Sequence, residues 1–355
     1  MHTTDSGLRQ PNKKVIWLVV AFLVIVVAGL MYVKWWPYYH KAFKAAADHS
    51  IGASILGDST GGAPSWEAAW GYAVVYFKAV WKAAIFGILL GSLLQVMLPS
   101  QWLLRVLGKA DFRSTALAGV ASLPGMMCSC CAAPIAVGMR KKQASVGASL
   151  AFWIGNPTLN PATLVFMTFV LSWKFTLLRL VFGLILVFGV SYLANRFVPA
   201  EKLPNEMKMD DPNVTPPAAP EQPLLVRWGK SILNMLISIV PAYIIFVLLL
   251  GAARVWLFPT MDIASGNTLL AIAGFALAGM LFVIPTAAEI PIIQSFMSLG
   301  LGAGPAAALM LTLPAISLPS MLMIGRAFPL RVMLFVAGSV VALGIVCGLV
   351  GMFVL

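Results

Sequence analysis

The chain is poor in charged residues, which make up only 10% of its 355 positions, whereas soluble proteins carry about 25%. Hydrophobic residues make up 60%, and the mean hydropathy is +0.92. A chain of this composition cannot cover its surface with polar groups, so we expect an integral membrane protein. Its apolar runs are about twenty residues long, which predicts spanning helices and excludes a barrel of alternating strands.

Several catalytic and nucleotide-binding motifs are missing. The chain has no G-x-x-x-x-G-K-[ST] sequence, so it encodes no ATP-driven pump of its own. It has neither H-E-x-x-H nor G-x-S-x-G, and its three histidines all precede residue 50. We therefore expect no enzymatic activity and no cofactor.

Acidic residues are also scarce, since 24 Lys and Arg face 12 Asp and Glu for a net charge of +12. The basic residues stand in short clusters beside apolar runs, as the positive-inside rule requires, and no basic stripe is interleaved with aromatics. This pattern argues against nucleic acid as a partner. It favours a multi-pass protein of the bacterial cytoplasmic membrane whose partners are the lipid bilayer and a small substrate, with a homodimer left open.

Basic clusters and prolines divide the chain into five parts. The apolar run Val15–Val33 is too long for the core of a signal peptide, and Lys13 and Lys14 before it place the N-terminus in the cytoplasm. The next six residues are Lys34-Trp35-Trp36-Pro37-Tyr38-Tyr39, a composition typical of an interfacial aromatic belt. We expect an N-terminal tail and first transmembrane helix at 1–34, an external loop at 35–69, a first permease repeat at 70–197, a cytoplasmic Pro-rich linker at 198–227 and a second repeat at 228–355.

Prolines recur at matching positions in the two halves. Pro134 and Pro157 lie 23 positions apart, and so do Pro291 and Pro314. Gly147 falls on Gly304 in the same alignment. Each half therefore has the same order of span, apolar piece, proline bend, proline-broken helix and span. This order predicts a duplicated unit.

The basic residues lie in different loops of the two copies. The first proline bend is followed by Arg140, Lys141 and Lys142, whereas the matching loop 298–302 has no charge. The loop between the last two helices of the second copy holds Arg326 and Arg331. The positive-inside rule then places the copies in opposite topology, as in many secondary transporters. We predict an all-α polytopic membrane protein with two inverted-topology repeats, re-entrant proline-broken helices and an extra N-terminal transmembrane helix.

Three of the four cysteines, Cys128, Cys130 and Cys131, fall within four positions beside Pro134. A single cysteine would be interpreted as a small packing residue, as we interpret Cys347. Three thiols within one turn suit a trivalent metalloid such as arsenic, because thiols are soft ligands. We therefore predict that these three residues bind the substrate.

Glu289 is the one acidic residue deep in the apolar regions, between Pro285 and Pro291. Intramembrane carboxylates usually mark a substrate or proton path, so we predict that Glu289 couples transport to protons. The alternative is a carboxylate that caps free backbone donors. Asn156 and Asn160 each precede a proline, and we leave open whether they line the substrate path or only cap a restarted helix.

The segments 124–134, 144–148 and 156–161 resemble the ArsP-like predicted-permease family, which includes organoarsenical efflux permeases. The resemblance covers about residues 70–355. It implies efflux of trivalent arsenicals, with Cys128 and Cys130 at the family's cysteine positions. Glycine is usual after the second cysteine in that family, where this chain has Cys131, so the site could extend to inorganic arsenite or antimonite.

The sequence therefore predicts a proton-coupled secondary transporter that exports trivalent arsenicals or related soft metalloids. Two alternatives stay open. One is a thiol–disulfide redox conduit, although such conduits usually place a cysteine in each copy and all three candidates here lie in one. The other is a channel for a small solute lined by the Asn-Pro breaks, which would not need Glu289.

Overall fold

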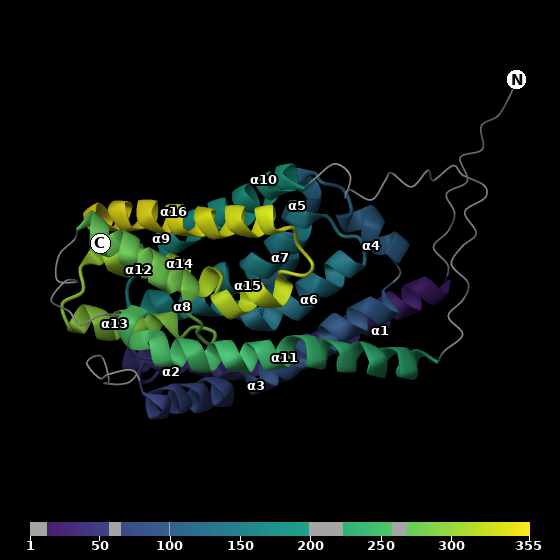
Figure 1. The fold of residues 1–355 in the computed structure, drawn as a ribbon, viewed down its shortest axis with the longest axis horizontal. Coiled ribbons are helices and arrows are strands. Elements are labelled where there is room, and N and C mark those ends of the chain that lie inside the picture. The colour runs from purple at the N-terminus through teal and green to yellow at the C-terminus, as the bar shows by residue number, and fades with distance from the viewer. Residues whose placement is uncertain (1–12, 57–64, 99, 199–222, 258–267) are drawn as a thin grey trace, which may run out of the picture.

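The computed structural model describes residues 13–56, 65–98, 100–198, 223–257 and 268–355 (Figure 1). Within these ranges every regular element is a helix, so the predicted all-α class is confirmed. Most of the predicted linker at 198–227 lies outside the described residues. Five helical stretches in the described ranges are long and apolar enough to cross a membrane: Trp17–Asp48, Ala69–Met97, Trp173–Phe197, Ala303–Ile324 and Leu330–Val354. The chain is thus a multi-pass membrane protein.

The first half of the chain contains a long helix followed by shorter, broken ones. In order, its elements are α1 (Lys13–Leu30), η1 (Met31–Trp35), α2 (Trp36–Asp48), α3 (Trp66–Met97), α4 (Ser100–Leu107), α5 (Phe112–Ser122), η2 (Leu123–Gly125), α6 (Ser129–Lys141), α7 (Val146–Thr158), α8 (Pro161–Val170), α9 (Trp173–Leu184), η3 (Ile185–Val190), α10 (Ser191–Leu193) and η4 (Ala194–Phe197). Asp111 begins α5 by accepting a hydrogen bond of 2.8 Å from the Ser114 N–H, which holds the pKa of that carboxyl below its ordinary value.

The second half also begins with a long helix and continues with shorter ones, but it has fewer elements within the described ranges. Its elements are α11 (Leu224–Leu257), α12 (Leu269–Leu281), α13 (Glu289–Ser298), α14 (Ala303–Ala315), α15 (Leu318–Ile324) and α16 (Leu330–Val354). The breaks predicted at the prolines are confirmed: α7 gives way to α8 around Leu159 and Asn160, and α14 gives way to α15 around Ile316 and Ser317.

The N-terminal helix is longer than the sequence suggested. The sequence predicts an external loop at 35–69, but α2 continues α1 and η1 as far as Asp48. Pro37 does not break this long helix. It lies in the first turn of α2, directly after the π-helical segment η1, where the backbone hydrogen bonds already depart from the α-helical pattern. The helix ends at His49, whose φ of 46° is left-handed.

The main helix contacts lie within each half and between the two long helices. α5 packs on α7 as α12 packs on α14, and the long helices α3 and α11 pack on each other. Contacts between the halves are reciprocal, because α6 touches α15 while α13 touches α8. In Figure 1, α13 lies toward the end that holds the C-terminus, whereas α6 extends toward the opposite end, where α4 lies. The two proline bends therefore lie in the interior, where the halves meet.

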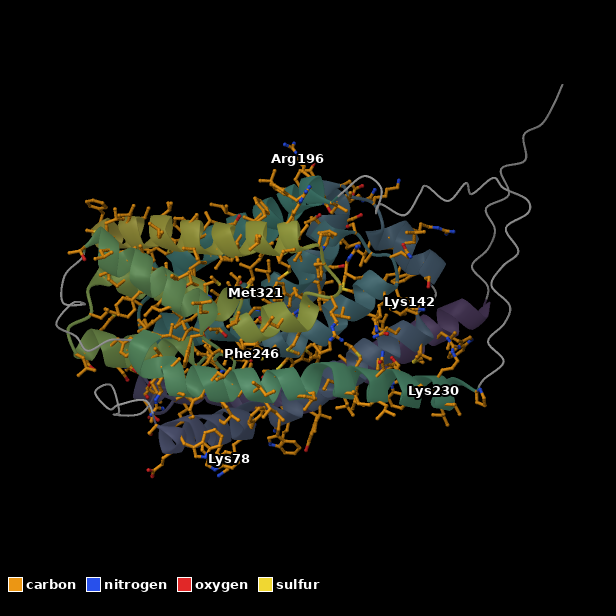
Figure 2. The ribbon with its side chains drawn as sticks, in the orientation of Figure 1. Lys78, Lys142, Arg196, Lys230, Phe246 and Met321 are labelled. Carbon is orange, nitrogen blue, oxygen red and sulfur yellow. The ribbon has the colours of Figure 1, made fainter. Side chains whose placement is uncertain are left out.

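Basic residues mark the two ends of the molecule. Lys142 follows α6 and Lys230 lies near the start of α11, and both lie toward the same end in Figure 2. Lys78, on α3, lies toward the other end (Figure 2).

Candidate functional site

The cysteine cluster forms the first turn of α6. Met126 adopts a left-handed φ of 49° and reverses the chain after η2, and Cys128 is the extended residue that caps α6. Residues three apart share one face of a helix, so Cys128 and Cys131 face each other, with sulfur atoms 2.7 Å apart. Both thiols are free and buried. The two cysteines form a Cys-x-x-Cys pair at a helix N-terminus.

Two glycines of α3 hold this turn in place. Gly87 lies against the carbonyl oxygen of Cys131, and Gly91 lies against the carbonyl group of Pro134. A side chain at either position would collide with the backbone of α6. The spacing Gly-x-x-x-Gly lets two membrane helices approach closely, which explains why α3 and α6 pack in direct backbone contact.

Cys130 lies on a different side of α6 from the other two cysteines. Its thiol is 3.6 Å from the hydroxyl of Ser317 and also faces the hydroxyls of Tyr76 and Tyr243. These two tyrosine oxygens are 2.5 Å apart. The three thiols thus do not converge on one point: Cys128 and Cys131 form a pair, and Cys130 belongs to a separate group of hydroxyls.

Glu289 is the first residue of α13 and forms a buried ion pair with Arg179 of α9. The Arg179 Nη1 donates to Glu289 Oε1 at 2.7 Å, and the two side chains are 0% and 1% exposed. Arg179 also donates to the carbonyl oxygens of Pro157 and Thr158, which close α7 at the proline break. The other carboxylate oxygen, Oε2, has no hydrogen-bond partner within the described ranges. Glu289 therefore pairs with a cation and does not cap backbone donors in those ranges.

A narrow cavity lies where the two proline bends meet, with room for about one water molecule. Cys128 contributes from the first half and Glu289 from the second, so the cysteine bend and the carboxylate bend share this space. The residues around it are Cys128, Pro157, Ile284, Pro285, Thr286, Ala287, Glu289 and Pro314. Prolines of both broken helices thus form part of the wall.

The two predicted asparagines lie outside the wall of this cavity. Asn160 caps α8, because its side-chain oxygen accepts from the N–H groups of Ala162 and Thr163 at 3.0 and 3.3 Å. Asn156 donates to the carbonyl oxygen of Phe152 one turn earlier, at 2.9 Å. Its own oxygen lies against Gly125 and has no partner among the described residues. Of the two interpretations, the geometry of Asn160 favours capping.

Lys34 reaches the same site from η1. The residue is 5% exposed, and its ammonium donates to Tyr38 Oη at 3.1 Å and to Thr286 Oγ1 at 3.2 Å. Thr286 is part of the cavity wall. The Lys34 charge also acts on the thiols of Cys128 and Cys131. The aromatic belt expected here is therefore interrupted by a cation that points inward.

Lys34 and Arg179 are the site residues that sequence reasoning missed. Arg179 carries a recognisable signal, since it is a cation inside the span Trp173–Phe197, about two turns from its start, whereas Lys174 and Arg196 lie at the two ends of that span. Lys34 carries none, because lysines at the end of a span normally extend to the interface. In the part of the chain that the structure describes, no group of three Cys, His, Asp or Glu side chains is arranged for a metal ion.

Fold and site together define a multi-pass helical membrane protein with a small polar site between its halves. Residues 80–353 match the ArsP_1 family of predicted permeases, so the chain belongs to this family of membrane transporters, as the sequence indicated. It is 50% identical over 335 residues to UPF0718 protein YraQ of Escherichia coli, covering 94% of each chain. It is 24% identical over 301 residues to UPF0718 protein MJ0584 of Methanocaldococcus jannaschii, covering 66% of this chain and 82% of the relative. No solved structure matches the chain significantly.

Proposed function

We propose that this permease exports trivalent arsenicals or related soft, thiol-binding species across the bacterial cytoplasmic membrane. The observation that carries the proposal is the contact between the Cys128 and Cys131 sulfur atoms beside the cavity between the halves. Two adjacent soft ligands suit a trivalent metalloid. Each new sulfur–arsenic bond replaces an arsenic-bound hydroxyl, which leaves as water with the thiol proton, and arsenic stays trivalent.

Cys128 and Cys131 are the binding pair in this proposal. Cys130, which the family resemblance favours, faces Ser317 and the tyrosines instead. Asn160 is assigned to the architecture of the site, since capping occupies its side-chain oxygen.

Transport in this proposal depends on two inverted repeats that rock against each other. Support comes from the reciprocal contacts of α6 with α15 and of α8 with α13, and from the opposite directions of α6 and α13 in Figure 1. The end with Lys142 and Lys230 is cytoplasmic by the positive-inside rule, and α1 begins toward the same end in Figure 1. A cavity with room for about one water molecule cannot hold the substrate, so the halves must separate to admit it.

Glu289 supplies the coupling to protons. Its Oε2 has no partner among the described residues while Oε1 is held by Arg179, so this oxygen is positioned to accept a proton. Protonation would weaken the ion pair between α9 and α13, which belong to different halves. Release of the substrate is thereby linked to a change in the contact between the repeats.

The test compares single serine variants in a bacterial strain that lacks its own arsenical exporters. Cys128→Ser and Cys131→Ser are expected to lose resistance to trivalent arsenicals with unchanged expression, and Cys347→Ser, outside the site, is the matched control. Everted vesicles should accumulate the arsenical only with an imposed pH gradient. Full resistance in Cys128→Ser would overturn the mechanism.

A redox conduit is the second candidate, because the Cys128–Cys131 pair has the Cys-x-x-Cys spacing at a helix N-terminus that dithiol oxidoreductases use. The second half contains only Cys347, so it offers no matching pair. In a conduit, the Cys128–Cys131 disulfide would form and be reduced with a partner oxidoreductase, which a gel shift with and without reductant detects. A shift that depends on such a partner favours the conduit over the exporter.

A further inference from the structure

Lys34 is a buried cation whose hydrogen bonds, within the described ranges, go to neutral hydroxyls. Its partners are Tyr38 and Thr286, at 3.1 and 3.2 Å. A buried charge is costly in a membrane protein unless an opposite charge accompanies it. The nearby carboxylate, Glu289, forms its ion pair with Arg179. The site thus contains two buried cations and one carboxylate.

The start of α6, the helix with the three neighbouring cysteines, adds further positive charge to the site. The N-terminus of a helix bears partial positive charge from its free N–H groups. At α13 that charge is matched by Glu289 in the first turn, whereas the first turn of α6 has no acidic residue. The free N–H groups of Cys130 and Cys131 in this turn face the sulfur of the cap residue, Cys128, and no carboxylate. Lys34 and the start of α6 therefore make the region around Cys128 favourable for an anion.

We propose that Lys34 is a substrate-binding residue and that the site prefers a soft centre that carries a negative charge close to it. The inference rests on the proposed binding of the soft centre by Cys128 and Cys131, and adds the charge of the substrate. Half-helix N-termini often point at anionic groups of transported substrates, and Lys34 supplies a full charge at the same place. The family match begins at residue 80, so the helix with Lys34 lies outside the matched segment.

A purely structural role for Lys34 would be to fasten η1 to Thr286. The two roles differ in what a substitution does to neutral and anionic substrates. Loss of an anchor would disturb both equally, whereas loss of a binding cation would affect only the anion. Electrostatic recognition is also retained by arginine, although the hydrogen-bond geometry differs.

The experiment measures binding of arsenicals to the full chain in lipid nanodiscs. The probes are phenylarsine oxide, which is neutral, and its ortho- and para-carboxylated derivatives, which are anions at neutral pH. We expect wild type to bind at least one carboxylated probe about tenfold more tightly than the neutral one. Lys34→Met should abolish this preference while it keeps the affinity for phenylarsine oxide, and Lys34→Arg should retain most of it. Lys44→Met, at an exposed position of α2, is the matched control and should behave as wild type.

Each other outcome overturns the inference in a recognisable way. An unchanged preference in Lys34→Met shows that another group recognises the charge. Equal loss of both kinds of probe in Lys34→Met shows that Lys34 is an anchor. If wild type binds none of the three probes, thiol binding itself fails, and the proposed function falls together with the inference that rests on it.

Discussion

Arg179 of α9 donates a hydrogen bond of 2.7 Å to Glu289 of α13, and both side chains are almost completely buried. The same guanidinium donates to the carbonyl oxygens of Pro157 and Thr158. One side chain thus connects the broken helix of the first half to the bend of the second half. Because proline breaks leave carbonyl groups without helical partners, Arg179 stabilises the break and the carboxylate together.

Removal of both partners should cost less stability than the two single removals add up to. Arg179→Met leaves a buried carboxylate without its cation, and Glu289→Gln leaves a buried guanidinium, so each should cost about 3–5 kcal/mol. The double variant should lose clearly less than the sum, as measured by unfolding in detergent. Additive losses would show that the two charges are not coupled. Vesicle uptake that still responds to a pH gradient in Glu289→Gln would remove this residue as the coupling group.

Gly87 should not tolerate a side chain. Even the methyl group of Gly87→Ala would collide with the carbonyl oxygen of Cys131, so α3 or α6 must shift, at a cost of about 1–3 kcal/mol. The shift would displace the cysteine turn, and binding of a dithiol-specific arsenical should fall. Gly71→Ala is the matched control on α3, because nothing lies within 4 Å of a side chain there. Equal behaviour of the two variants would contradict the close approach.

Asn160 should be replaceable by another helix cap. Asn160→Ser keeps an oxygen that can accept from Ala162 and Thr163, whereas Asn160→Ala loses about 0.5–2 kcal/mol of stability. Resistance to arsenicals should survive in the serine variant. If Asn160→Ser folds normally but transports nothing, its amide contacts the substrate and capping is not its whole role.

The bends could be predicted from the sequence because proline spacing repeats in both halves and proline has fixed local effects. The same holds for Cys128 and Glu289, whose chemistry is unusual in apolar segments. The different surroundings of the Cys130 and Cys131 thiols depend on which helices pack around α6. The spacing of residues along the sequence does not give these neighbours. The sequence predicts Lys34 at the membrane interface, yet η1 places its side chain inward, at hydrogen-bond distance from Thr286. Only the packing of the N-terminal helix against the second half determines that direction.

Arg140 connects the two halves at the end of α6. Its Nε donates to the carbonyl oxygen of Ala327 at 3.5 Å, and its guanidinium lies 5.7 Å from the ring of Phe328. If this end must open to admit substrate, Phe328→Ala should favour opening, since a cation–π contact contributes about 0.5–1 kcal/mol. In a chain whose only cysteine is Cys128, a membrane-impermeant maleimide should label this variant about two- to fivefold faster from the cytoplasmic side. Lys141→Ala, at an exposed neighbouring position, is the control and should label at the parent rate. Faster labelling from the opposite side alone would place the opening at the other end of the molecule.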